Sequence, residues 1–143
     1  MADHKDYSGT PLWRKLGIKE GARVLCTRAP DAFDAELERL APLPPGVARL
    51  RRLGGDLDVV VAFCTRRAEV ARDVPRLAPA IAPDGRLWIA WPKKAAKVDT
   101  DLDFDTVQSA GLGAGLVDNK SASITDVFQG MQFVVRVKDR PVP

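Results

Sequence analysis

The feature that most constrains the fold of this chain is a run of consecutive apolar residues from Val59 to Cys64. The longer segment from Leu57 to Cys64 is largely apolar on both faces of an extended strand. A strand with one face in water alternates apolar and polar residues, whereas a strand buried on both faces does not. The segment therefore predicts the central strand of a parallel sheet that helices cover on both sides.

Strand and helix patterns alternate around this segment. Because strands alternate with helices, we expect a mostly parallel sheet. The predicted fold is a three-layer, Rossmann-like α/β domain over residues 1–143, with a C-terminal antiparallel hairpin and flexible ends at 1–10 and 140–143. The expected elements are an amphipathic turn at 11–17, a strand at 23–26, a helix at 31–41, an edge strand at 47–53, the central strand at 57–64, a helix from about 65 to 81, a strand at 86–91, a helix at 103–111, and hairpin strands at 116–125 and 132–138.

The first two long helices carry signals at their ends. We expect Asp31 to cap the helix at 31–41 and Leu40 to lie on its buried stripe. Thr65 is expected to cap the next helix. Pro75 is expected to break that helix and to start a second short one, because proline donates no backbone hydrogen bond and its ring clashes with the preceding turn.

The C-terminal part is predicted from similar signals. Asp103 is expected to cap the helix at 103–111, which would bury Phe104, Val107 and Leu112. The hairpin that follows is expected to turn at residues 126–131, around Gly130. Earlier in the chain, Pro83-Asp84-Gly85 is expected to form a turn before the strand at 86–91.

Composition excludes several classes of protein. The chain has 143 residues, of which 45% are hydrophobic and 29% charged, as in an ordinary soluble domain. Its longest apolar run is far too short to span a bilayer, and its N-terminus lacks a signal-peptide core. Two cysteines do not make a disulfide framework. We therefore expect a cytoplasmic protein with reduced thiols.

The sequence lacks the parts of a nucleotide-cofactor site. Such a site on this kind of sheet needs a glycine-rich turn after the first strand and an acidic residue at the end of the second. Here the turn is Cys26-Thr27-Arg28-Ala29-Pro30, without glycine, and Arg51 and Arg52 end the second strand. Arginines at this position suit a 2′-phosphate, but we expect no cofactor.

Catalytic and metal chemistry are equally unsupported. The single histidine, His4, is remote from both cysteines, so neither a thiol nucleophile nor a zinc site can be assembled. Cys26 and Cys64 follow neighbouring strands, which leaves a redox pair open, but small buried side chains are the favoured interpretation. The aspartates at 99, 101 and 103 mimic a calcium loop whose glycine and glutamate are missing. We expect no bound metal, and the lack of a catalytic constellation favours a protein that is not an enzyme.

A second marked segment is Trp91-Pro92-Lys93-Lys94. We expect Trp88 and Trp91 in the core and Pro92 to end their strand. The two lysines then stand at the carboxyl end of a parallel strand, where open α/β sheets bind ligands. Basic residues also outnumber acidic ones over residues 1–97, which allows an anionic ligand.

Basic residues follow three of the predicted strands at this edge, beside two helix N-termini that favour anions. The predicted ligand site comprises Arg28, Thr65, Arg66, Arg67, Lys93, Lys94 and, from the hairpin, Lys120.

Two resemblances extend this interpretation. The terminal antiparallel hairpin is similar to that of class I methyltransferase-like Rossmann sheets, of which this chain would be a reduced version. The segments YSGTPLWRKLGIKEGARV, DVVVAFCTRRAEV, LWIAWPKKAAKVDTDL and GLVDNKSASI resemble the uncharacterised bacterial family DUF3052. This second resemblance implies a fold and no reaction. Similar sequences tend to carry Trp-Ser-Gly where this chain has Phe128-Gln129-Gly130.

The sequence therefore favours a non-enzymatic module that binds a small anionic ligand or a protein partner at the strand edge. One alternative is a divergent or degenerate methyltransferase-like enzyme, with Asp118 or Lys93 as its acid–base group. Another is a structural module that forms homo-oligomers through an edge strand. Nucleic-acid binding is disfavoured, because the aromatic residues mostly fall at core-facing positions and not among the basic ones.

Overall fold

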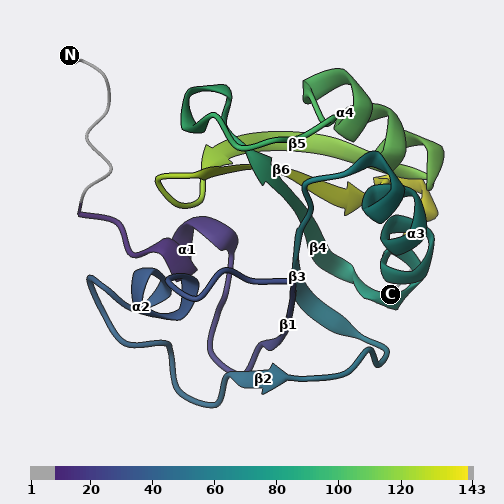
Figure 1. The fold of residues 1–143 in the computed structure, drawn as a ribbon. Coiled ribbons are helices and arrows are strands. Elements are labelled where there is room, and N and C mark those ends of the chain that lie inside the picture. The colour runs from purple at the N-terminus through teal and green to yellow at the C-terminus, as the bar shows by residue number, and fades with distance from the viewer. Residues whose placement is uncertain (1–8, 142–143) are drawn as a thin grey trace.

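Six strands form one sheet in the order β2-β1-β3-β4-β6-β5 (Figure 1). The structure, a computed structural model, describes residues 9–141, so the flexibility expected for residues 1–8 and 142–143 lies outside the described part of the chain. The strands are β1 (Arg23–Thr27), β2 (Ala48–Leu50), β3 (Leu57–Phe63), β4 (Ile81–Pro92), β5 (Leu116–Ser123) and β6 (Phe128–Val135).

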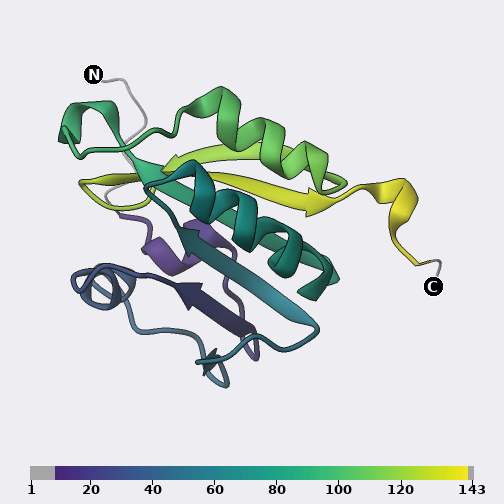
Figure 2. The same cartoon turned by 45° about the vertical axis from the view of Figure 1, so that its right-hand side comes forward.

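Strands β1 to β4 are parallel, and β6 pairs antiparallel with both β4 and β5. Helices α3 and α4 pack on one face of the sheet, and α1 and α2 pack on the other (Figure 2). This arrangement confirms the predicted three-layer α/β fold. The helices are α1 (Leu12–Leu16), α2 (Phe33–Leu37), α3 (Arg67–Leu77) and α4 (Phe104–Gly113), with short 3₁₀ turns η1 (Ala78–Ala80), η2 (Lys94–Ala96) and η3 (Val137–Asp139).

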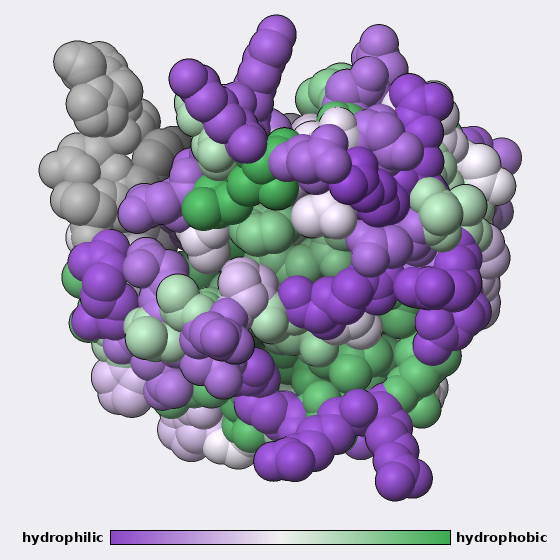
Figure 3. Space-filling view, in the orientation of Figure 1, coloured by the Kyte–Doolittle hydropathy of each residue, from purple (hydrophilic) through white to green (hydrophobic). Residues whose placement is uncertain are grey.

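Hydrophilic side chains cover much of the face drawn in Figure 3, with smaller hydrophobic areas between them. Within residues 9–141, no helix has both the length and the apolar character that crossing a membrane requires. The large apolar side chains are gathered instead in two clusters, one on each face of the sheet.

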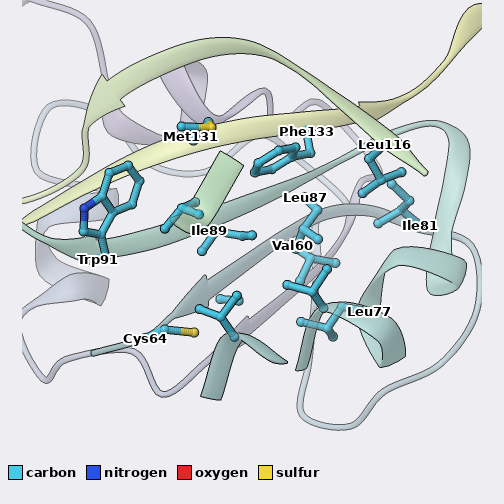
Figure 4. Close-up of a cluster of buried hydrophobic side chains, with 14 of the residues drawn as sticks. Val60, Cys64, Leu77, Ile81, Leu87, Ile89, Trp91, Leu116, Met131 and Phe133 are labelled. Atoms are coloured by element: carbon cyan, nitrogen blue, oxygen red, sulfur yellow. The ribbon is translucent and has the colours of Figure 1, made fainter. Parts of the chain in front are cut away.

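The cluster beneath α3 and α4 contains buried side chains from five strands, β1, β3, β4, β5 and β6, most of which Figure 4 draws. Val60 of β3, Leu87 and Ile89 of β4 and Phe133 of β6 are fully buried in it. Each such side chain contributes about 1.5–3 kcal/mol when it leaves water. The alternate residues of β3, Val59, Val61 and Phe63, are buried in the cluster on the other face of the sheet. This confirms that the strand is covered on both faces.

The second cluster lies beneath α1 and α2 and is rich in aromatic side chains. The ring of Phe63 meets those of Phe33 and Phe128 edge to face, at centroid distances of 5.0 and 5.1 Å. Trp88 is fully buried, and its indole Nε1 donates a hydrogen bond of 3.0 Å to the carbonyl oxygen of Leu16 at the end of α1. Trp88 is thus a core residue, as predicted.

Strand β4 begins five residues earlier than expected. Pro83-Asp84-Gly85 was predicted to be a turn, but the segment belongs to β4, where the pairing with β3 shifts register between Leu57 and Val59. A Cβ at Gly85 would lie 2.6 Å from the carbonyl oxygen of Leu57. The glycine therefore permits a close approach of two strands within an irregular ladder.

Helix α2 is shorter than predicted. It spans five residues instead of the expected 31–41, Asp31 does not cap it, and Leu40 is 41% exposed. Side chains bind the backbone just beyond its end. The Trp13 indole donates to the carbonyl oxygen of Ala41, and the Leu43 N–H donates to the Glu38 carboxylate.

The predicted break at Pro75 is wrong. Helix α3 passes through Pro75 to Leu77, and one 3₁₀ turn, η1, follows it in place of a second helix. Pro75 stands near the end of the helix, so only the last turn lacks its hydrogen bond. Its neighbours Val74 and Leu77 are buried against the sheet, which holds this turn in place.

Helix α4 buries fewer of its residues than expected. Asp103 caps the helix as predicted and accepts a 2.8 Å hydrogen bond from the Thr106 N–H. Of the three side chains predicted to be buried, only Val107 is, while Phe104 and Leu112 are 49% and 41% exposed.

The hairpin turns earlier than expected, at residues 124–127, before β6 begins. Gly130 lies inside β6, where a Cβ would be 2.9 Å from Ile124. Close packing, and not the turn, therefore requires this glycine.

The packing of α4 on β6 gives a first prediction. A Cβ at Gly111 would lie 2.0 Å from the Phe133 ring, whereas one at Gly113 would meet no described atom within 4 Å. We expect Gly111→Ala to lower the free energy of unfolding by about 1–3 kcal/mol through overpacking. The matched variant Gly113→Ala should leave it unchanged or raise it by up to about 1 kcal/mol, because alanine favours helix.

Urea denaturation of both variants measures these changes. Equal stability of Gly111→Ala and the parent would show that α4 can move away from Phe133 at little cost.

Candidate functional site

The four parallel strands end at one edge of the sheet, in the order β2, β1, β3, β4. This is the edge at which doubly wound sheets bind their ligands. Basic residues follow each of these strands, as Arg51, Arg28, Arg66 and Lys93. They spread along the edge and take part in three separate groups of contacts.

The first group forms a pocket of about 500 Å³ at the ends of β1 and β2, beside α3. We call it the arginine pocket, because four arginines and one aspartate supply its charged lining. Its lining consists of Leu25, Cys26, Thr27, Arg28, Arg51, Arg52, Leu53, Asp73, Arg76 and Leu77.

Arg28 occupies the turn where a nucleotide-binding sheet has glycine. Its φ is 55°, the left-handed region that glycine adopts most readily. Its guanidinium pairs with Asp73 through Nη2 and with Glu69 through Nε, the second at 3.3 Å. These ion pairs with α3 offset the backbone strain. The turn thus keeps the left-handed conformation of a glycine turn but fills the space with a side chain.

Asp73 organises this pocket. Its side chain is only 3% exposed and pairs with Arg28, Arg72 and Arg76, the last two at 3.3 Å. Breaking a buried ion pair costs more than its formation contributes, because it leaves a charge unpaired. Asp73 therefore holds Arg28 and Arg76 at the wall of the pocket.

Thr27 supplies a polar group to the floor of the pocket. Its side chain shares a face of β1 with Leu25, because side chains alternate along a strand. The Thr27 hydroxyl is buried and has no hydrogen-bond partner among the described residues. An unsatisfied buried hydroxyl costs about 1–3 kcal/mol. Thr27 lines the pocket, and a ligand group that reached its hydroxyl would satisfy it.

The second group surrounds the N-terminus of α3, and carboxylates of the chain itself occupy it. Asp101 Oδ1 accepts the Arg67 N–H at 2.7 Å, and Asp99 pairs with Arg66 at 2.7 Å. Thr65 does not cap α3. Its N–H donates to Glu69, and this hydrogen bond, followed by the nearby Arg28, lowers the pKa of the Glu69 carboxyl.

The third group collects lysines at the end of β5. Lys93 Nζ donates to the Ser123 hydroxyl at 2.7 Å, and Lys120 Nζ donates to the carbonyl oxygen of Lys15 at 3.1 Å. Burial and the nearby ammonium groups of Lys93 and Lys120 lower the pKa of Lys15. Lys120 also lies 5.8 Å from the Trp88 ring centroid, so it ties α1 to the sheet.

The seven predicted site residues therefore do not form a single site. Arg28 lines the arginine pocket, while Thr65, Arg66 and Arg67 form the group at α3. Lys93 and Lys120 belong to the lysine group, and Lys94 is exposed.

Sequence reasoning missed Asp73, Arg76 and the role of Thr27. A signal for Asp73 was present, since an acidic residue falls on the buried stripe of α3 between Val70 and Leu77.

The cysteines lie on opposite faces of the sheet, which excludes a redox pair in this structure. Cys64 belongs to the cluster beneath α3 and α4, and Cys26 packs against the other cluster. Burial raises the pKa of Cys26 to about 11 and that of Cys64 to about 12. Both thiols are therefore protonated and unreactive near neutral pH.

Neither a second large hollow nor a cluster of metal ligands provides an alternative site for a charged ligand in the described residues. A hollow of about 700 Å³ lies between α3 and α4 and is lined mostly by small and apolar side chains. Within residues 9–141, no three His, Cys, Asp or Glu side chains are grouped as a metal would require.

Comparisons with known proteins identify the fold. No family model and no curated protein matches the sequence, so membership of DUF3052 stays a prediction. The structure is similar to magnesium protoporphyrin IX methyltransferase (ChlM) from Synechocystis PCC 6803, solved with bound SAM, at a TM-score of 0.60 and 11% identity over 87% of this chain and 74% of that one.

Two other solved structures are similar to this chain in fold. A TehB-like SAM-dependent methyltransferase from Corynebacterium glutamicum has a TM-score of 0.53 and 13% identity over 94% of this chain and 91% of that one. A SAM-dependent methyltransferase from Aquifex aeolicus has a TM-score of 0.53 and 15% identity over 87% and 88%. The chain therefore has a Rossmann-like, methyltransferase-like fold, which does not by itself carry the activity.

The carboxylates at α3 give a second prediction. We expect Asp101→Ala to lower the free energy of unfolding by about 1 kcal/mol, because the Arg67 N–H at the helix N-terminus loses its acceptor. The control is Asp84→Ala, which removes an exposed carboxylate with no hydrogen bond among the described residues. Thermal and urea denaturation compare the two. Equal effects would mean that Asp101 acts only through net charge.

The thiols give a third prediction. With a pKa of about 11, only about one Cys26 in a thousand is a thiolate at pH 8, against about a quarter of free cysteine. Iodoacetamide should therefore leave both cysteines of the native protein unmodified while it alkylates glutathione fully, as mass spectrometry would record. Urea-unfolded protein is the positive control. Rapid alkylation of the native protein would reveal an activated thiol.

Proposed function

We propose that this chain binds a small anionic ligand in the arginine pocket and does not use S-adenosylmethionine. The observation that carries the proposal is the charge of the lining, four guanidinium groups against one carboxylate, at the ligand-binding edge of the sheet.

The guanidinium groups suit an anion in number and in position. Arg51 and Arg52 come from the end of β2, and Arg28 and Arg76 face them from the β1 turn and α3. Guanidinium forks recognise carboxylate and phosphate through paired hydrogen bonds. Because Asp73 already fixes Arg28 and Arg76, these side chains lose less conformational freedom when a ligand binds.

The residues of this pocket do not fit S-adenosylmethionine. Its ribose hydroxyls need an acidic acceptor at the end of β2, where Arg51 and Arg52 stand. Its sulfonium is positively charged and would meet a positively charged lining. The β1 turn that should approach the cofactor with glycine carries the Arg28 side chain. The pocket thus opposes the cofactor by charge and by shape.

A second candidate is a divergent methyltransferase-like enzyme, which the fold comparisons favour. Either Asp118 or Lys93 was considered as its acid–base group, and each contacts another side chain of the protein. Lys93 donates to Ser123 at the end of β5, whereas Asp118 lies near the start of that strand and accepts a 3.3 Å hydrogen bond from Gln108. The fold is therefore the main support for this candidate.

Ligand-induced stabilisation separates the two functions. We expect inorganic phosphate or AMP to raise the unfolding midpoint in a saturable way, since free ligand at 100 times its Kd adds about 2.7 kcal/mol. S-adenosylmethionine should produce no shift. In Arg51→Gln/Arg52→Gln the shift should disappear, because the pocket loses two of its four guanidinium groups. The variant should still fold, since neither arginine forms an ion pair within the described residues.

The control is Lys94→Gln/Lys97→Gln, which removes the same charge near the same edge but outside the arginine pocket. It should respond as the parent does. An equal response of both double variants, or no response of the parent to any anion, would contradict the anion site. Saturable stabilisation by S-adenosylmethionine would support the methyltransferase.

A further inference from the structure

We infer that the ligand of the arginine pocket is a phosphate monoester of a sugar or nucleoside, and that the Thr27 hydroxyl binds a polar group of the body that carries the phosphate. This inference rests on the proposed function, since it identifies the chemical class of the anion.

The charge of the pocket favours a phosphate monoester over a carboxylate. Asp73 and Glu69 together balance Arg28 and Arg76, while Arg51 and Arg52 add two guanidinium groups without a carboxylate of their own among the described residues. A monocarboxylate would neutralise only part of this excess. A phosphate monoester carries a charge of about −1.5 to −2 at pH 7 and presents three acceptor oxygens. It therefore matches the excess in charge and in number of hydrogen bonds.

The size of the pocket calls for more than a phosphate ion. A volume of about 500 Å³ falls in the usual range for small organic ligands, roughly 300–1,000 Å³. The arginines stand at the wall, and the remaining lining includes Leu25, Leu53 and Leu77. Leu53 is 41% exposed although it is a large apolar residue. A ligand body over these leucines would remove apolar surface from water.

Thr27 gives this body a polar contact. Its hydroxyl can both donate and accept, and it is buried without a partner among residues 9–141. The rest of the pocket's polar side chains are charged, so Thr27 is the neutral group that can read a hydroxyl or carbonyl. A site built to hydrogen-bond such a group discriminates strongly against ligands that lack it.

Isothermal titration with four probes tests the inference. The probes are inorganic phosphate, ribose 5-phosphate, AMP and adenosine. We expect at least one of the two monoesters to bind about tenfold or more tightly than inorganic phosphate, and adenosine to show no binding. Thr27→Val should weaken that monoester by about tenfold and leave inorganic phosphate unchanged, because the wall of arginines is intact.

Thr27→Val should fold, since valine has the same shape and suits a strand, and the unliganded variant should be at least as stable as the parent. Ser121→Ala, which removes an exposed hydroxyl from β5, is the control and should bind every probe as the parent does.

Each outcome separates the two proposals. Equal affinity for inorganic phosphate and both monoesters would overturn the further inference and leave the anion site standing. Unchanged monoester affinity in Thr27→Val would overturn the role of Thr27. Binding of none of the phosphates would overturn both proposals.

Discussion

The structure depends on the burial of β3 on both of its faces. From Val59 onward its side chains alternate between the two apolar clusters, and every residue of the strand except Asp58 is buried. Asp58 lies near the start of the strand, where its carboxylate accepts the Arg23 N–H at 2.8 Å. Because both faces must be kept from water, helices are needed above and below, and β1 and β4 must flank the strand. The three layers follow from this one requirement.

The same arrangement brings the ends of the parallel strands to one edge, where this kind of sheet binds its ligands. Arginines stand where a cofactor needs glycine and a carboxylate. Carboxylates stand at the N-terminus of α3, where Asp101 occupies a position that could bind an external anion. The fold provides the edge, and the residues on it decide which ligand it can hold.

Local patterns predicted most of the architecture. The double-faced apolar run, the strand that ends at Pro92 and the cap at Asp103 were correct, because each depends on neighbouring residues. The errors arose where distant residues intervene. Helix α2 ends before Leu40, and the indole of Trp13, 28 positions away in the sequence, donates to the carbonyl oxygen of Ala41 just beyond it. Gly85 and Gly130, interpreted as turn residues, lie within strands, where a Cβ would come close to the Leu57 carbonyl oxygen in one case and to Ile124 and Trp88 in the other.

The sequence alone determined the class of fold and the lack of a glycine turn, because both are properties of short segments: apolar periodicity in one case and residue identity in the other. Only the tertiary structure decided which charged residues act together. Arg28 meets Asp73 across 45 positions of sequence, and Arg67 meets Asp101 across 34. Such pairs depend on where the crossover helices return to the sheet, which no local spacing encodes. The arginine pocket is therefore a consequence of the assembled fold.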